Sequence, residues 1–154
     1  MILANEYDER AMQAVAAALG RRLMPGDVVT LQGEMGAGKT SFAQGLIRAI
    51  AMDAPEVTSP TYTLMQSYDV AFKSGKGLLW HMDLYRLTRE SELDQLGLEE
   101  LLPQALLIEW PEIALARLPG ERLDITIAFA AGGAARRLGF SGNDAWRKRL
   151  EGIA

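Results

Sequence analysis

The chain has 154 residues, of which 49% are hydrophobic, and this length fits one compact domain, residues 1–154, around one core. It has no cysteine and a single histidine, His81, which excludes a disulfide framework and a zinc site built from Cys and His ligands. The formal net charge of −4 argues against a DNA-binding protein, which needs an excess of Lys and Arg. No run of about 20 apolar residues and no export signal is found in the sequence, so we expect a cytoplasmic protein that does not span a membrane.

The first third of the chain predicts a helix, a strand and a second helix. Apolar side chains at helical spacing after the possible cap Asp8 predict an amphipathic helix that ends near residues 20–25. The β-branched run at residues 28–32 is typical of a buried strand. A glycine-rich turn follows it directly, and residues 41–51 then have a helical pattern. We therefore expect strand, loop and helix in direct succession.

The rest of the chain predicts strands that alternate with helices. Apolar runs predict strands at residues 62–68, 78–82, 105–108, 123–129 and 136–140. Helical patterns occur at residues 90–102, 111–117 and 143–150. We expect an exposed hairpin or loop at residues 70–77 and a turn at residues 130–135. The alternation indicates an α/β protein with a layered sheet, largely parallel at its centre.

A phosphate-binding loop is the most specific motif. The segment GEMGAGKT, residues 33–40, matches G-x-x-x-x-G-K-[ST] in full and lies between a predicted strand and a predicted helix. Its glycines allow backbone N–H groups to face a phosphate, and the following helix presents its positive end there. Lys39 is expected to lie along the β- and γ-phosphates, and the Thr40 hydroxyl to ligate Mg²⁺. The residues expected to hold the nucleotide, ATP or ADP, are Glu34, Met35, Gly36, Ala37, Gly38, Lys39, Thr40 and Ser41.

This loop refines the predicted fold class. It indicates a three-layer P-loop NTPase-like α/β fold, with a largely parallel central sheet and antiparallel edge strands. The competing interpretation is a glycine-rich turn with an incidental lysine, which would carry no nucleotide chemistry.

Hydrolysis also requires an acidic residue near the metal and the γ-phosphate, and two carboxylates qualify. Asp83 and Glu109 each follow an apolar run that predicts a strand. Since the C-terminal ends of parallel strands open onto the ligand crevice, both acids are expected near the phosphates. We predict Glu109 on the metal side and Asp83 as the residue that positions the attacking water; Lys39 completes the catalytic set. Asp83 is also a candidate metal ligand, since Mg²⁺ can take one carboxylate directly and another through water. The alternative is ordinary strand-end carboxylates that face solvent, and we interpret His81, inside an apolar run, as structural.

A hydroxyl-rich segment, residues 57–63 (VTSPTYT), follows the helix after the phosphate loop. Nucleotide switches place such a hydroxyl on the γ-phosphate and magnesium. The alternative interpretation is a turn that enters an edge strand.

Several blocks of sequence coincide at this point. GEMGAGKTSFAQGL, VTSPTYTLMQSY, HMDLYRL and IEWPE lie in this order between Gly33 and Glu112, about half of the chain. Together they closely resemble the bacterial TsaE (YjeE) family, the small ATPases of tRNA threonylcarbamoyladenosine synthesis. The resemblance implies an ATPase that joins the TsaD and TsaB proteins and whose hydrolysis is required for repeated cycles of N6-threonylcarbamoyl transfer to adenosine 37 of tRNA. It does not make this chain the transferase, and tRNA contact is expected to be indirect.

The resemblance also implies roles for individual residues. It places the family's switch threonine on Thr61, its acidic pair on Asp83 and Glu109, and its functional tryptophan on Trp110. We therefore add Thr61 and Trp110 to the expected nucleotide site, although Trp110 is equally explained as packing beside the following proline. Arg86 is a further candidate for the site or for a partner contact.

Three other functions share the phosphate loop. A small-molecule kinase needs an arginine-bearing lid, for which Arg117 and Arg122 are the candidates, but the segment between them is short. A GTPase needs an Asn-Lys-x-Asp motif, which the sequence lacks. A nucleotide sensor would bind ATP or ADP with negligible turnover, and only a measurement of phosphate release separates it from an ATPase.

Overall fold

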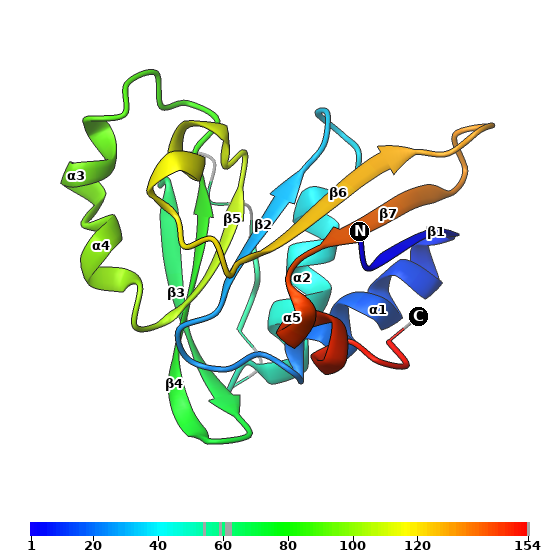
Figure 1. The fold of residues 1–154 in the computed structure, drawn as a ribbon, viewed down its shortest axis with the longest axis horizontal. Helices are drawn as coiled ribbons and strands as arrows, with labels where there is room; N and C mark the ends of the chain where they lie inside the picture. The colour runs from blue at the N-terminus through cyan, green and yellow to red at the C-terminus, as the bar shows by residue number, and fades with distance from the viewer. Residues whose placement is uncertain (54, 59, 61–62, 154) are drawn as a thin grey trace.

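The computed structural model describes residues 1–53, 55–58, 60 and 63–153, and their arrangement is drawn in Figure 1. The first helix, α1 (Glu9–Gly20), begins where its sequence predicts. The carboxylate of Asp8 accepts a hydrogen bond of 2.8 Å from the Ala11 amide and so caps the helix. The second predicted helix is α2 (Lys39–Ile50), which follows the strand β2 (Val28–Gln32) after one loop. The predicted succession of strand, loop and helix is confirmed.

Seven strands of the described chain form one mixed sheet in the order β1-β7-β6-β2-β5-β4-β3. The other strands are β1 (Leu3–Tyr7), β3 (Met65–Phe72), β4 (Gly75–Asp83), β5 (Ala105–Glu109), β6 (Leu123–Phe129) and β7 (Arg136–Ser141). At the centre, β2 is parallel to both β5 and β6, and β4 is parallel to β5. The pairs β3 with β4, β6 with β7 and β7 with β1 are antiparallel. The predicted parallel centre and antiparallel edges are therefore confirmed.

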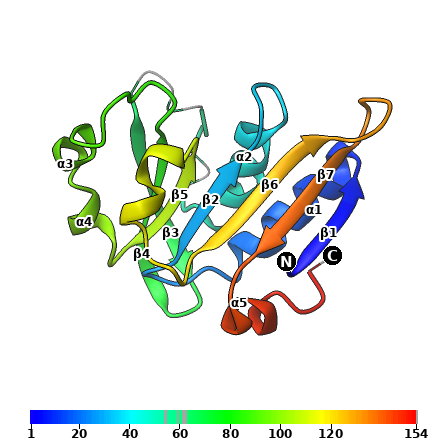
Figure 2. The same cartoon turned by 45° about the horizontal axis from the view of Figure 1, so that its top comes forward.

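Apolar side chains cover both faces of the sheet. Successive residues of β2 point to opposite sides, so Val28 belongs to one hydrophobic cluster while Val29 and Leu31 belong to the other. The larger cluster joins the sheet to α1 and α2, which lie behind β2, β6 and β7 in Figure 2. The smaller cluster packs under α3 (Glu92–Leu96), α4 (Leu98–Leu101) and the 3-10 helix η1 (Glu112–Arg117). Because both faces of the sheet are buried, the central strands are continuous apolar runs in the sequence.

The edges of the sheet differ from the predictions. Strand β1 was not predicted, because apolar and polar residues do not alternate regularly over residues 3–7. In the structure this edge strand pairs with β7. The predicted loop at residues 70–77 is wrong, since β3 extends to Phe72 and β4 begins at Gly75, with register pairs from Phe72↔Gly75 onward. Only Lys73 and Ser74 form the turn. The prediction of a hairpin here is correct. The strand predicted at residues 62–68 corresponds to β3, which begins later, at Met65; Tyr62 lies outside the described residues.

Two helix predictions are also corrected. The single helix expected at residues 90–102 is split into α3 and α4 because Gly97, at φ 72°, adopts a left-handed conformation that interrupts the helix. The helix expected at residues 111–117 is the 3-10 helix η1. The last helix, α5 (Asp144–Arg149), agrees with its prediction and is capped by the Asn143 side chain. No helix in the described part of the chain combines the length and apolar character needed to cross a bilayer.

Candidate functional site

The phosphate-binding loop joins the C-terminal end of β2 to the first turn of α2. Gly36 and Gly38 have φ angles of 80° and 115°, values that L side chains rarely adopt. The Ala37 amide donates to the Glu34 carbonyl at 3.1 Å, which closes a tight turn inside the loop. A Cβ at Gly33 would lie 2.3 Å from the carbonyl oxygen of Ile127 in β6. The glycines are therefore required by the turn and by the close approach of a neighbouring strand.

The side chain of Lys39 is folded into the interior of this loop. Its Nζ donates to the carbonyl oxygens of Gly33 at 2.5 Å and Glu34 at 2.8 Å, and lies 4.1 Å from the centre of the Trp110 ring. Only 5% of the residue is exposed. Burial lowers the pKa of Lys39 from its ordinary value, and the nearby carboxylates, first Glu109 and then Asp83, oppose this shift. The ammonium is thus desolvated at the place where the phosphates are expected.

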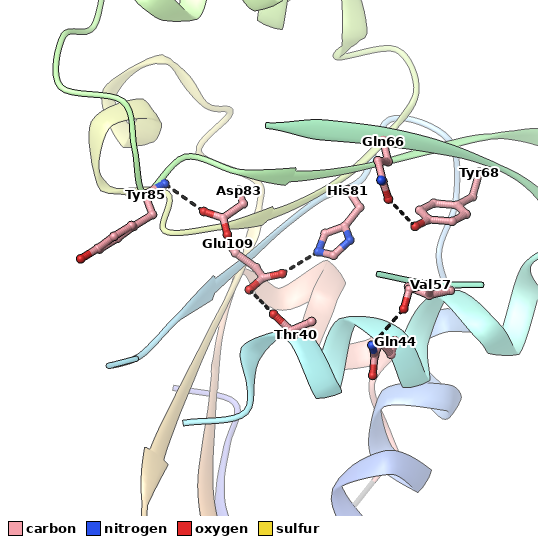
Figure 3. Close-up of polar contacts among 9 residues, drawn as sticks. All are labelled: Thr40, Gln44, Val57, Gln66, Tyr68, His81, Asp83, Tyr85 and Glu109. Carbon is pink, nitrogen blue, oxygen red and sulfur yellow. Dashed lines mark hydrogen bonds and ion pairs between the residues drawn. The ribbon is translucent and has the colours of Figure 1, made fainter. Parts of the chain in front are cut away.

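Glu109 links the loop to the sheet, as Figure 3 shows. The Thr40 hydroxyl donates to Glu109 Oε1 at 3.0 Å, and Glu109 Oε2 lies 2.6 Å from His81 Nε2. Both Glu109 and His81 are buried. The carboxylate is therefore held between a hydroxyl on α2 and an imidazole on β4, so its orientation is defined.

Asp83 lies beside Glu109 because the parallel strands β4 and β5 pair these two residues in register. Its Oδ1 accepts a hydrogen bond from the Tyr85 amide at 2.9 Å, and the residue is 4% exposed. The structure thus brings both predicted carboxylates to the phosphate loop, buried and on neighbouring strand ends. The interpretation of the two acids as ordinary solvent-facing carboxylates does not agree with this burial.

Trp110 has an unusual backbone conformation for an aromatic residue, with φ at 53°. Left-handed geometry at a bulky residue is strained and is found mostly at functional sites. The ring contacts Tyr85, with 4.7 Å between ring centres, and covers the Lys39 ammonium. This backbone conformation directs the face of the Trp110 ring toward the lysine of the phosphate loop.

These side chains enclose a cavity of about 330 Å³. It is lined by ten residues: Met35, Gly36, Gly38, Lys39, Thr40, Ser41, Asp83, Tyr85, Glu109 and Trp110. Glu34 and Ala37 belong to the loop but do not line the cavity, and Thr61 lies outside the described residues. The Ser41 hydroxyl donates to Glu9 of α1 at 2.7 Å, so its side chain also joins the two helices.

The sequence reasoning missed three residues at this site. His81 was interpreted as structural, and only its place two residues before Asp83 hinted at a contact with the acids. Tyr85 carried no signal of its own beyond its membership of the HMDLYRL block. Arg136, whose Nε donates to the Ala37 carbonyl at 2.8 Å, lies 99 residues away in sequence, and nothing local marked it.

The arginines considered for a kinase lid are engaged elsewhere. Arg117 forms ion pairs with Asp94, at 2.6 Å, and with Glu99. Arg122 pairs with Asp124 at 2.9 Å, at the N-terminal end of β6 and so at the opposite end of the sheet from the phosphate loop. Arg86 is exposed next to Tyr85. Neither lid candidate lines the cavity, which removes the feature on which the kinase alternative depended.

Known proteins are similar to this chain in sequence and in fold. A family profile described as "Threonylcarbamoyl adenosine biosynthesis protein TsaE" matches residues 6–138. The chain is 38% identical over 125 residues to the tRNA threonylcarbamoyladenosine biosynthesis protein TsaE of Bacillus subtilis, a match that covers 80% of this chain and 73% of that protein. It is 37% identical over 121 residues to the protein of the same name from Borreliella burgdorferi, covering 76% and 82%.

Two further matches define how far the likeness extends. The protein of the same name from Rickettsia felis is 39% identical over 114 residues, which cover 73% of this chain but 63% of that longer protein. The crystal structure of Bacillus subtilis YdiB superposes with a TM-score of 0.76 at 27% identity, over 98% of this chain and 93% of that one. The profile covers most of the chain, and the relatives carry one name. The chain belongs to the TsaE family.

Proposed function

We propose that this protein binds ATP with Mg²⁺ at residues 33–40 and hydrolyses it in the synthesis of threonylcarbamoyladenosine in tRNA. The observation that carries the proposal is the contact of the Thr40 hydroxyl with Glu109, because it joins the phosphate loop to a buried carboxylate at a strand end. Loop, lysine, hydroxyl and acid together are the parts that phosphoryl transfer from a nucleotide needs. The names of the relatives support the role in tRNA modification.

The arrangement also supports a three-layer P-loop NTPase-like fold. Helices on both faces of a sheet with a parallel centre, and a phosphate loop between β2 and α2, are the features of that class. The ligand crevice is expected at the C-terminal ends of the parallel strands, where Asp83 and Glu109 lie.

The residues of the cavity fit a nucleotide and a magnesium ion. Thr40 and Glu109 place two oxygen atoms 3.0 Å apart, with the Asp83 carboxylate on the adjacent strand, and such hard oxygen donors are those that Mg²⁺ prefers. Bound there, Mg²⁺ would neutralise charge on the β- and γ-phosphates. To meet the phosphates, the Lys39 ammonium must leave the carbonyl oxygens of Gly33 and Glu34.

Each acid has a separate task in this proposal. Glu109 lies on the metal side, since its Oε1 is in contact with Thr40. Asp83 orients the attacking water, and Lys39 stabilises charge that develops on the transferred phosphate. Thr61 is proposed to contact the γ-phosphate, and Trp110 to cover the phosphate site. Glu34, Met35, Gly36, Ala37, Gly38 and Ser41 complete the nucleotide-binding set.

Partners are proposed to complete the site. No arginine is among the described residues that line the cavity, so intrinsic hydrolysis should be slow. We propose that TsaD and TsaB, the partners that the family resemblance implies, raise the rate, and that tRNA is contacted through them in the cytoplasm.

Calorimetry and phosphate release together test the proposal. Purified protein should release heat on titration with ATP or ADP at millimolar Mg²⁺, and phosphate release should rise when TsaD and TsaB are added. Reconstituted tRNA modification should continue over repeated cycles only when this protein is present. Binding without any phosphate release in the assembled complex would identify a nucleotide sensor, and no heat from either nucleotide would refute the proposal.

A further inference from the structure

The hairpin of β6 and β7 contacts the phosphate loop through one side chain. Arg136 is the first residue of β7, and its Nε donates to the Ala37 carbonyl oxygen at 2.8 Å. Its Nη1 donates to the carbonyls of Gly133 at 3.0 Å and Ala135 at 3.3 Å in the turn of the same hairpin. The guanidinium also stacks 4.4 Å from the centre of the Phe129 ring. One planar group thus ties the hairpin to the loop.

The bond to Ala37 determines how the next peptide unit is oriented. In a trans peptide the C=O and the following N–H point in opposite directions, and no cis peptide bond occurs in the described chain. With the Ala37 carbonyl turned toward Arg136, the amide of Gly38 points the other way. Gly38 lines the cavity while Ala37 does not, which agrees with an amide directed at the cavity side of the loop.

Glycine makes this peptide unit easy to reorient. Gly38 has no Cβ and adopts φ 115°, a region in which the preceding peptide plane can rotate with little steric resistance. The turn bond from Ala37 N to Glu34 O holds the other side of Ala37 but leaves its carbonyl free to rotate. A donor on the outer side of the loop is therefore what keeps the amide in a single orientation.

We propose that Arg136 is a positioning residue that orients the peptide between Ala37 and Gly38, so that the Gly38 amide meets the phosphates of the bound nucleotide. This inference rests on the proposed nucleotide site and adds to it a group from outside the motif. Arg136 itself touches neither phosphate nor metal in this role. Its planar fork is needed, since a lysine ammonium cannot reach the carbonyls of Ala37, Gly133 and Ala135 in one plane.

The neighbouring Arg137 supplies a matched control. It is the next residue of β7, points to the opposite side and pairs with Glu6 of β1 at 2.9 Å. Its side chain is 60% exposed, so its removal changes the net charge as removal of Arg136 does, without touching the loop.

Calorimetric titration of ADP and ATP with Mg²⁺ tests the inference on Arg136→Ala, Arg136→Lys and Arg137→Ala. Loss of the hydrogen bond should weaken binding of both nucleotides about tenfold in Arg136→Ala. Arg136→Lys should recover little of this loss, although it keeps the charge. Arg137→Ala should bind within about twofold of the unmodified protein.

A second readout separates positioning from general stability. In nucleotide-free protein the backbone amide resonance of Gly38 should shift and broaden in Arg136→Lys, because the peptide then samples more than one orientation, while the amide resonances of the buried strand β5 stay unchanged. This comparison decides the matter even if Arg136→Ala does not fold. Full affinity in Arg136→Lys, an unchanged Gly38 amide resonance, or an equal loss in Arg137→Ala would each overturn the inference. Failure of the unmodified protein to bind nucleotide would instead refute the proposed function.

Discussion

His81 Nε2 lies 2.6 Å from Glu109 Oε2, and both side chains are buried. The other oxygen of Glu109 accepts the hydrogen bond from Thr40. Among the described residues, His81 Nδ1 has no hydrogen-bond partner, so the bond to Glu109 is the polar contact that orients the ring. The imidazole therefore supports the carboxylate that the proposed mechanism places beside magnesium.

Removal of either carboxylate should separate nucleotide binding from hydrolysis. We expect Glu109→Gln and Asp83→Asn to bind ATP within a few-fold of the unmodified protein, because the backbone of the loop and Lys39 remain. Hydrolysis should fall by about 100-fold or more, since metal and water lose their orientation. Lys39→Ala is the matched contrast and should lose tight binding itself. Phosphate release at the unmodified rate in both carboxylate variants would show that their roles are wrongly assigned.

Substitution of His81 should act through Glu109. We expect His81→Leu to lower kcat about 10- to 100-fold, as loss of a supporting contact does at metal sites, while KM for ATP changes little. It should also lower the free energy of unfolding by about 1–3 kcal/mol, because a buried carboxylate loses a partner. His81→Gln keeps a donor and should recover part of kcat. The measurement is a steady-state series over Mg²⁺ concentration, and equal kcat in both variants would contradict a role through hydrogen bonding.

The buried Lys39 predicts a particular pH dependence of stability. Burial lowers the folded-state pKa below the ordinary value of 10.5, so between the two values the unfolded chain binds more protons. Stability from this group therefore rises with pH across that window and is lowest below the folded-state pKa. We expect the Tm of nucleotide-free protein, relative to that of Lys39→Met, to increase as the pH approaches 10.5. Parallel Tm curves for the two proteins would refute this.

Gly33 is predicted to be intolerant of even one methyl group. In Gly33→Ala the Cβ would lie 2.3 Å from the backbone oxygen of Ile127, so the loop and β6 must separate. We expect a loss of about 1–3 kcal/mol and a Tm lower by several degrees, together with weaker nucleotide binding. Gly120→Ala is the control, since its Cβ meets nothing within 4 Å. Equal Tm values for the two variants in thermal unfolding would contradict the close contact.

The parts of the fold that sequence predicted well depend on local patterns. The capped helix after Asp8, the apolar strand β2 and the glycine-rich loop before α2 each have a signal within a dozen residues. The edge strand β1 had no such signal, because its pairing with β7 depends on residues about 130 positions away. The break at Gly97 was also missed, since a helical pattern continues on both sides of it.

The candidate site divides in the same way. The loop, Lys39 and Thr40 follow from one contiguous motif, and the two acids follow from their position at the ends of apolar runs. The left-handed backbone conformation of Trp110 could not be predicted from the sequence, because aromatic residues rarely adopt a positive φ. That strain is maintained by the contacts of its ring with Tyr85 and Lys39.

The sequence by itself determined the α/β class, the phosphate loop and the acids that face it, because hydrophobic period, glycine spacing and strand ends are local properties. The tertiary structure alone decided which distant side chains support them: His81 on Glu109, 28 residues apart, and Arg136 on Ala37, 99 residues apart. Such contacts depend on strand order and register, which are fixed by the packing of the whole sheet and not by any segment of it.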